Sequence, residues 1–338
     1  MDELNKEEIL EIAINHEARL RTENFSKAEI ETRKAKLTPL NDTIFEHIFA
    51  KKRNYLIATE IVNSIYEVYG LPKIGLIEKA KVQKSTVHTS FLDGNTIENK
   101  KMVGDFVGRS GNLTISIEGQ SRKQEDYDIR SVLTSSNVMR EGLKRGKRYK
   151  TSRDVIGINI LGFKMPSLSY KKDFLTRIVR SDYDMKIHFL AEKYSDYYLE
   201  LPKLPKEKES VKENYVLIWE MCKAFSVKYK NLEEVLNMQT ITSPGAVHLL
   251  EEFYNSLTDD VLVYEALTKE EAANIYLDQL KEKKIEGKIE GKIESKMEIA
   301  LEMLTEGFDL KMISKVLKMP INWVERLIEE NNYRPKSD

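Results

Sequence analysis

The spacing of apolar residues predicts helices in the N-terminal part of the chain. Residues 3–35 are rich in Glu and Lys and have only sparse apolar positions, a pattern typical of a helical, solvated arm. After the break at Thr38-Pro39, Asn41 or Asp42 can cap a new helix. Its apolar face comprises Ile44, Phe45, Ile48 and Phe49. Apolar residues at helical spacing over 56–68 predict a second helix, which packs through the same kind of stripe.

Alternating and continuous apolar runs predict strands from Lys79 onwards. β-Branched residues recur with a period of two over residues 79–90, and the alternation returns over 101–107 and 113–120. A helix-like segment at 122–145 precedes the nearly continuous apolar run 155–163, which is typical of a strand buried on both faces. The order of helices, strands, helix and strand predicts an α/β fold in which helices pack on a mixed sheet.

The segment from residue 165 to residue 258 carries weaker signals. Residues 183–198 contain strand-like apolar and aromatic positions. Trp219 and Cys222 lie on a helical apolar stripe, a pattern more typical of a core or an interface than of a cofactor site.

The C-terminal part is typical of a long charged helix followed by two short ones. Apolar residues recur every four positions at Ile285, Ile289, Ile293, Met297 and Leu301. A lone apolar stripe on a charged helix needs a partner, and a period of four argues against an ordinary left-handed coiled coil. We therefore expect a linker or dimer helix that extends back to about Glu270. Beyond Gly307, two short helices broken at Met319-Pro320 resemble a degenerate helix-turn-helix, and a helical cap or dimer module explains them as well as DNA contact does.

These patterns divide the chain into four parts. We expect a helical arm over 1–37, a core with accessory elements over 38–258, the long charged helix over 259–303 and a small helical tail over 304–338. A chain of 338 residues is long enough for a core of about 150–200 residues with such appendages.

Composition narrows the choice of partners and compartment. Lys and Arg number 54 against 55 Asp and Glu, so any attraction to nucleic acid must come from local patches. The single cysteine, Cys222, forms no internal disulfide, which fits a reducing cytoplasm. The acidic start of the sequence lacks an apolar signal segment, and no run approaches the ~18 apolar residues of a spanning helix. We expect a soluble, cytoplasmic protein that does not enter membranes.

Candidate chemistry lies in the predicted hairpin within residues 100–120. Side chains alternate across a strand, so Glu118 and Gln120 share one face. A turn centred on Gly111-Asn112 places Asp105 directly opposite Glu118, whereas a turn centred on Ser110-Gly111 places it opposite Ser116 on that face. Both registers bring an acidic pair near the end of the second strand.

An acidic pair on adjoining strands favours a cation between the two carboxylates. Asp105 and Glu118 would lie about 5 Å apart and repel each other. Oxygen ligands without nearby His or Cys indicate Mg²⁺, or Mn²⁺, and the carbonyl of Gly119 can add a third oxygen. Gln120 can position an attacking water. The alternative is an edge hairpin with a solvated polar face and no metal.

A basic run follows the hairpin. Between Arg140 and Arg153 the chain has seven basic residues and one acid, Glu141. Such a run is a solvated face in many proteins, but beside a carboxylate metal site it indicates a groove for a polyanion, contacted through its phosphates. The basic residues that we assign to this groove are Arg140, Lys144, Arg145, Lys147 and Arg148.

The hairpin and its surroundings resemble the PD-(D/E)xK nuclease superfamily, and more narrowly its recombination-promoting nuclease and transposase group. The similarity covers roughly residues 38–330 and rests on segments such as DTIF (42–45), GNLTISIEGQ (111–120), GKRY (146–149) and the GKIE tail. It implies a restriction-endonuclease-like mixed sheet flanked by helices, with a C-terminal helical extension. By the same resemblance, Asp105 and Glu118 are metal ligands and Gln120 takes the third catalytic position. Arg130, in the matching segment 128–130, joins the DNA-binding residues.

The sequence also departs from the group's pattern. Gly104 replaces the Pro of the superfamily name, and Glu46 stands where the group usually has Lys. Gln120 in place of Lys removes a cation that could stabilise the transition state, so slow or conditional cleavage is expected.

The sequence thus predicts a magnesium-dependent DNA endonuclease that serves DNA recombination or mobility and dimerises through its C-terminal helix. A transposase-related protein with little or no catalytic activity, which binds DNA or regulates through its tail, is the main alternative. A helical scaffold protein is the third.

Overall fold

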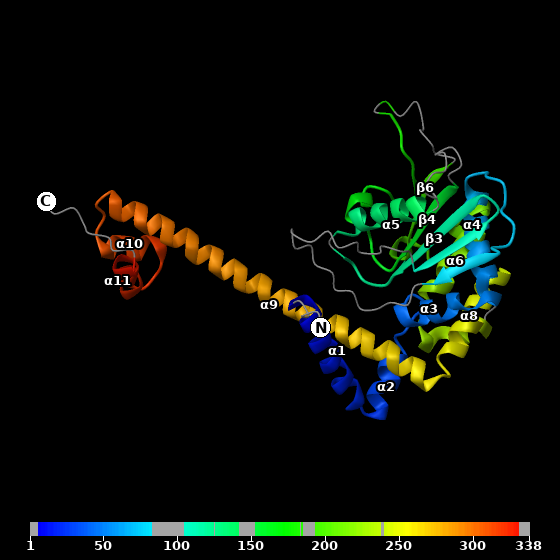
Figure 1. Ribbon diagram of the computed structural model, residues 1–338, viewed down its shortest axis with the longest axis horizontal. Coiled ribbons are helices and arrows are strands. Elements are labelled where there is room, and N and C mark those ends of the chain that lie inside the picture. Colours follow the sequence, from blue (N-terminus) through cyan, green and yellow to red (C-terminus); the bar gives the residue numbers. More distant parts are fainter. Residues whose placement is uncertain are drawn as a thin grey trace. The chain divides into compact units, whose positions relative to one another are not determined.

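The computed structural model describes residues 6–82, 105–124, 126–141, 153–182, 184, 193–237 and 240–330 (Figure 1). The chain forms two compact units, residues 1–272 and residues 273–338. The described residues include no helix that is long and apolar enough to cross a membrane.

The first unit is built on a mixed six-stranded sheet, as the sequence predicts. Its strand order is β1-β2-β3-β4-β6-β5. The strands are β1 (Lys79–Val82), β2 (Phe106–Ser110), β3 (Leu113–Gln120), β4 (Asp154–Leu161), β5 (Leu175–Ile178) and β6 (Tyr194–Glu200). β3, β4 and β6 run parallel, whereas β1–β2, β2–β3 and β5–β6 are antiparallel pairs. The apolar run predicted at 155–163 is the central strand β4, buried along nearly all its length. The short edge strand β5 was not predicted.

Helices cover both faces of the sheet. Parallel strands need a crossover connection, and α5 (Tyr127–Glu141) provides it between β3 and β4. On the other face lie α3 (Asp42–Ala50), α4 (Tyr55–Val68), α6 (Val216–Ser226) and α8 (Pro244–Ser256), as Figure 1 shows. The main apolar core lies between these four helices and strand residues such as Ile115, Ile117 and Ile158. Trp219 and Cys222 of α6 belong to it, which confirms their interpretation as core residues.

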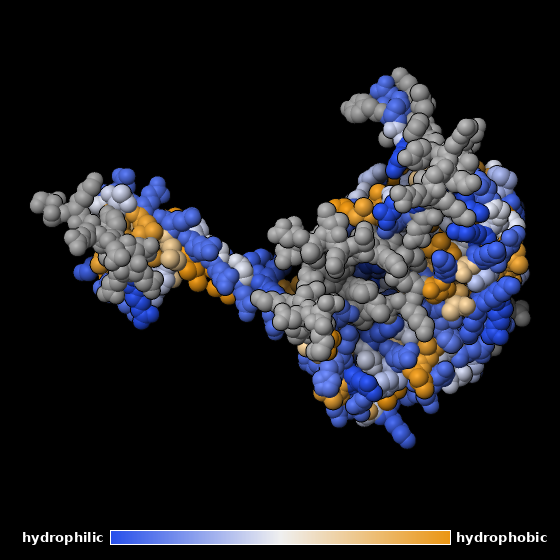
Figure 2. Space-filling model, in the orientation of Figure 1, coloured by the Kyte–Doolittle hydropathy of each residue, from blue (hydrophilic) through white to orange (hydrophobic). Residues whose placement is uncertain are grey.

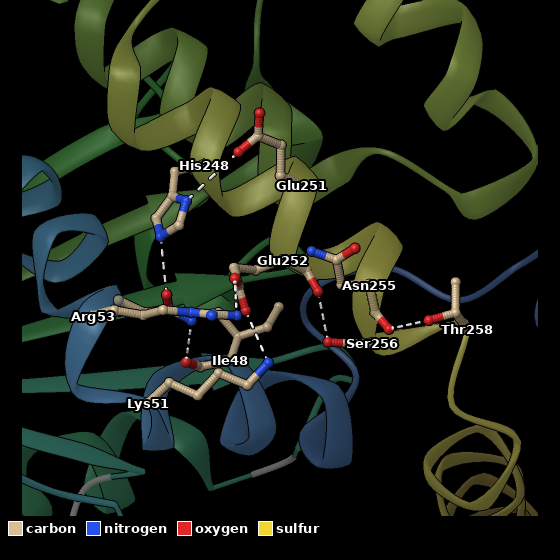
Figure 3. Close-up of polar contacts among 10 residues, drawn as sticks. Ile48, Lys51, Arg53, His248, Glu251, Glu252, Asn255, Ser256 and Thr258 are labelled. Atoms are coloured by element: carbon tan, nitrogen blue, oxygen red, sulfur yellow. Dashed lines mark hydrogen bonds and ion pairs between the residues drawn. The ribbon is translucent and has the colours of Figure 1, made fainter.

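A buried carboxylate fixes α8 to the end of α3. Glu252 is buried, and it accepts hydrogen bonds from Lys51 Nζ at 2.8 Å and from Arg53 Nη2 at 2.6 Å (Figure 3). His248, one turn earlier on α8, contacts Asn54 Oδ1 through Nε2 at 2.9 Å. Because an unpaired buried charge is costly, these partners specify how the two helices meet.

The N-terminal arm is helical, but it is not fully solvated as its composition suggested. It comprises α1 (Lys6–Glu23) and α2 (Lys27–Lys34). Ile14, Ala18 and Thr22 form a buried row on α1. Arg21 and Arg33 both pair with Glu271 of α9 (Asp260–Thr305), at 3.1 and 3.0 Å. The sparse apolar residues of the arm therefore have packing partners.

The second unit contains the rest of α9 with α10 (Leu310–Leu317) and α11 (Ile321–Glu330). The long helix begins at Asp260, ten residues before Glu270 and one residue after the start of the predicted helical segment 259–303. The two short helices break at Lys318, which takes a left-handed conformation (φ 52°), followed by Met319 and Pro320, as predicted. Their core comprises Ala300, Leu304, Ile313, Leu317, Val324 and Leu327.

Candidate active site

The hairpin of β2 and β3 has the register that a Gly111-Asn112 turn predicts. Phe106 pairs with Ile117 and Ser110 pairs with Leu113, so the turn is centred on residues 111 and 112. Gly111 has a φ of 55°, a conformation that glycine adopts without strain. Asp105 directly precedes Phe106, and the continued register places it opposite Glu118. The alternative turn at Ser110-Gly111 is excluded.

Asp105 and Glu118 are tied together by reciprocal bonds between backbone and side chain. The N–H of Asp105 donates to Glu118 Oε1 at 3.1 Å, and the N–H of Gly119 donates to Asp105 Oδ2 at 3.0 Å. The β2–β3 ladder ends at the pair Phe106 and Ile117. The N–H groups of Asp105 and Gly119 lie beyond it and are therefore available for these two bonds. Within a strand the N–H and C=O of one residue point the same way, and the Gly119 carbonyl therefore faces this edge as well.

Burial and nearby negative charges raise the pKa values of both carboxylates. Burial raises the pKa of Asp105 to about 7, and the nearby charges of Asp42 and Glu46 act in the same direction. Burial and, after it, the charge of Asp105 raise the pKa of Glu118 well above its usual range, and this residue is only 4% exposed. Desolvated acids that share one site are stabilised by a positive charge placed between them.

The sequence reasoning missed Asp42 as a site residue. Asn41 caps α3 by accepting from the N–H of Ile44 at 3.4 Å, so the Asp42 carboxylate is not the cap of the helix. Solvent reaches Asp42, yet the surrounding protein raises its pKa through desolvation. Its charge acts on both Asp105 and Glu118. The DTIF segment was a signal for this position, but either Asn41 or Asp42 could cap the helix, so the sequence did not show that Asp42 is left for the site.

Close packing of α3 on β3 brings Asp42 to the site. A Cβ added at Gly119 would lie 2.9 Å from two ring carbons of Phe45. Only a residue without a side chain allows this approach of the helix. On the same helix, Glu46 pairs with Lys269 of α9 at 3.7 Å. Lys269 therefore lies beside Glu46, the residue that stands where the resembling group usually has Lys.

Gln120 and Arg130 are joined through Gln124. Gln124 donates to Gln120 Oε1 at 3.0 Å and accepts from Arg130 Nη1 at 2.7 Å. Arg130 Nη2 lies 3.9 Å from Glu118 Oε2, and its side chain is 41% exposed. The positive charge of Arg130 lowers the pKa of Asp105 and of Glu118, which partly offsets burial. The guanidinium thus faces both the acids and the solvent.

A buried polar pair lies beside Glu118. Asn159 of β4 pairs with Glu118 in the parallel ladder and accepts from the hydroxyl of Tyr127 at 2.8 Å. Burial raises the pKa of Tyr127 well above its usual range, so the phenol stays neutral and donates the hydrogen bond to Asn159. No sequence pattern pointed to this pair, because it depends on the parallel register of β3 and β4.

The predicted basic groove is only partly described. Arg140 is exposed near the end of α5, about 15 Å along the helix axis from Arg130. Lys144, Arg145, Lys147 and Arg148 lie outside the described residues. Arg153 donates to the carbonyl of Gly111 at 2.8 Å, so it contacts the hairpin turn. Of the predicted DNA-binding residues, the structure places Arg130 beside the acids.

The donor set fits a hard divalent cation. Asp105, Glu118 and the Gly119 carbonyl offer only oxygen atoms, and the repulsion between the two acids provides a reason to bind a cation. Among the described residues no three Asp, Glu, His or Cys side chains are gathered closely enough to form a metal site by themselves. A bound ion would complete its shell with water, as Mg²⁺ commonly does.

Comparison with known proteins agrees with this geometry. The family model described as PD-(D/E)XK nuclease family transposase matches residues 39–243, more than half of the chain. The chain belongs to this family. PD-(D/E)XK proteins of this kind have a mixed sheet flanked by helices, as the structure does here. No curated protein and no solved structure matches the chain.

Proposed function

We propose that this PD-(D/E)XK family member is a divalent-metal-dependent endonuclease that hydrolyses phosphodiester bonds in DNA. The observation that carries the proposal is the pairing of Asp105 with Glu118 at the end of β3, where each side chain accepts from the backbone beside the other. Two carboxylates that share a buried position repel each other, and the charge of Arg130 offsets this only in part, so the pair favours a bound cation.

One set of site residues would bind a cation, and another would contact the phosphate. Asp105, Glu118 and the carbonyl of Gly119 would hold Mg²⁺, or Mn²⁺. When bound, such an ion acidifies a water and neutralises charge that develops on the phosphate. The negative charge of Asp42 increases the affinity for the cation. Gln120, oriented by Gln124, hydrogen-bonds the attacking water.

The exposed guanidinium of Arg130 is the contact for the phosphate that is cleaved. It lies near Glu118, and its hydrogen bond to Gln124 fixes its orientation. Arg140 on α5, together with Lys144, Arg145, Lys147 and Arg148, which lie outside the described residues, would contact neighbouring phosphates without reading sequence. We further propose that the protein acts in the cytoplasm, as a homodimer through α9, in DNA recombination or mobility.

Plasmid cleavage tests the proposal directly. Purified protein with Mg²⁺ should nick or linearise supercoiled DNA, and EDTA should stop it. Asp105→Asn should abolish cleavage, because the amide cannot bind a cation as a carboxylate does. Asp126→Asn is the matched control, since Asp126 is an exposed acid just before α5. Equal cleavage by Asp105→Asn and Asp126→Asn would refute the site.

One observation favours a second function, that of a DNA-binding regulator without cleavage. The third catalytic position holds Gln120 rather than a cation, and its oxygen already accepts from Gln124. Under this alternative, Mg²⁺ would leave DNA affinity unchanged, and removing residues 273–338 would abolish binding. Under the nuclease proposal, Mg²⁺ changes the affinity, and residues 1–272 retain DNA binding.

A further inference from the structure

Four parallel rows of residues follow the middle of α9, each with a spacing of four. One row is basic, the next apolar, the third acidic and the fourth small. They comprise Lys284, Lys288, Lys292 and Lys296; Ile285, Ile289, Ile293 and Met297; Glu286, Glu290, Glu294 and Glu298; and Gly287, Gly291 and Ser295. We call the second of these the Ile row and the fourth the Gly row.

The Ile row is open to solvent in the second unit. Ile285, Ile289 and Ile293 are 58%, 52% and 37% exposed. Figure 2 shows hydrophobic residues interrupting the hydrophilic surface along this helix. Further along, Met297 and Leu301 pack against the small core of α10 and α11. The apolar stripe therefore continues the core of the second unit onto an uncovered helix surface.

The charged rows are not arranged to stabilise a lone helix. Lys288 and Lys292, like Glu290 and Glu294, have a like charge four residues away and no opposite charge at three or four residues. Like charges at this spacing destabilise an isolated helix. Just before the repeat, by contrast, Lys281 pairs with Asp278 at 2.8 Å in the ordinary way. We therefore expect the Lys and Glu rows to pair with opposite charges on another molecule.

A second copy of the helix supplies those charges in one orientation only. At 100° per residue, the Lys row lies on one side of the Ile row and the Glu row lies on the other. If two copies pack through their Ile rows and run parallel, the two-fold axis runs parallel to the rows. Each Lys row then faces the Glu row of the partner. If they run antiparallel, Lys faces Lys and Glu faces Glu. We propose that α9 forms a parallel homodimer through Ile285, Ile289 and Ile293.

The row geometry also predicts how the helices meet. Residues four apart form ridges inclined to the helix axis, and two such ridges pack with a crossing angle of about −50°. The contact is therefore short, unlike the long seam of a coiled coil with heptad repeats. Gly287 and Gly291 lie on the opposite side of the helix and take no part. This inference rests on the homodimer proposed above and adds its face and direction, and it is independent of nuclease activity.

Disulfide trapping in the full chain tests both the face and the direction. In a parallel dimer each residue of the Ile row faces its own counterpart, so Ile285→Cys alone and Ile293→Cys alone should each give linked dimers under mild oxidation. The native Cys222 is fully buried and provides the unlinked background. Gly287→Cys and Gly291→Cys are matched controls on the Gly row and should not form linked dimers.

Three results would overturn the proposal. Linkage only in a mixture of Ile285→Cys with Ile293→Cys would show an antiparallel dimer. Linkage through the Gly row but not the Ile row would place the interface on the other face. Absence of linkage in every variant, with a monomeric mass for the parent protein at the highest concentration tested, would show that no dimer forms.

Charge reversal gives an independent measurement. K288E/K292E makes both flanking rows acidic, and E290K/E294K makes both basic, so each variant alone should self-associate at least ~10-fold more weakly in sedimentation. Mixed together, the two should recover association as a heterodimer. Circular dichroism checks that both remain helical. Unchanged self-association of either variant, or no recovery in the mixture, would refute the charge complementarity.

Discussion

The backbone N–H of Asp105 donates to the carboxylate of Glu118, while the Asp105 carboxylate accepts from the N–H that follows Glu118. The two acids therefore hold each other in position before any cation arrives. Their placement depends on the backbone of the hairpin and not on a flexible loop, so the oxygen donors are preorganised.

Neutral substitutions of the same shape at Asp105 and Glu118 should distinguish an effect on cleavage from an effect on folding. Asp105→Asn and Glu118→Gln keep the shape of each side chain but remove the charge that binds a cation. We expect cleavage to fall at least ~100-fold, with circular dichroism unchanged. Thermal unfolding with and without Mn²⁺ should show stabilisation of the parent and none of either variant. A variant that loses activity but is still stabilised by Mn²⁺ would contradict the assignment of its residue as a ligand.

The raised pKa of Asp105 predicts an unusual dependence of stability on pH. In an unfolded chain an Asp titrates near pH ~3.9, whereas burial raises the Asp105 pKa to about 7 in the folded protein. The folded state therefore keeps a proton that the unfolded state has lost, and this stabilisation is full below pH ~4 and is lost as the pH rises through 7. Without divalent ions, Asp105→Asn should be more stable than the parent at pH 8, and the difference should be smaller at pH 5 and disappear below pH ~4.

Addition of Mn²⁺ should reverse that difference at pH 8, because the cation replaces the missing proton. The shift in melting temperature caused by Mn²⁺ should be larger at pH 8 than at pH 5. Equal shifts at both pH values would contradict titration of the acidic pair.

Neighbouring residues at the start of α3 should have separable effects. Asp42→Asn removes a charge that acts on both acids, so we expect about 10-fold weaker Mn²⁺ binding with the helix cap intact. Asn41→Ala removes the cap and should cost about 1 kcal/mol of unfolding free energy, with little change in Mn²⁺ affinity. Calorimetric titration and denaturant unfolding of both variants test this. The reverse pattern would mean that Asp42 has a structural role.

Salt dependence should reveal whether Arg130 contacts a phosphate. Each phosphate contact contributes about 0.9 to the slope of log K against log salt. Arg130→Ala should therefore lower that slope by about 1. Arg19→Ala is the control, since Arg19 is an exposed residue of α1 that pairs with Glu23. An unchanged slope for Arg130→Ala would assign its guanidinium to the acids alone.

Local sequence was sufficient for the centre of the site. The apolar alternation limited the hairpin to two registers that keep the apolar faces together, with turns at Gly111-Asn112 or Ser110-Gly111, and the structure has the first. The apolar run of β4 likewise identified a strand that is buried on both faces. These features depend on neighbours within about ten residues.

The remaining parts depend on residues that are distant in sequence. Asp42 joins the site because Phe45 packs against Gly119, more than seventy positions away. The edge strand β5 is only four residues long and exists through its pairing with β6. No periodicity in the sequence encodes such contacts, since each requires the sheet order to be known first.

Position 119 has consequences for how the sequence can vary. Its N–H holds Asp105, its carbonyl faces the acidic edge, and its missing side chain admits Phe45. A residue with no reactive group is therefore as constrained as the acids beside it. In a library of all single substitutions selected for activity, we expect Gly119 to be as intolerant as Glu118. Even alanine should fail there, because its methyl group would separate the helix from the strand.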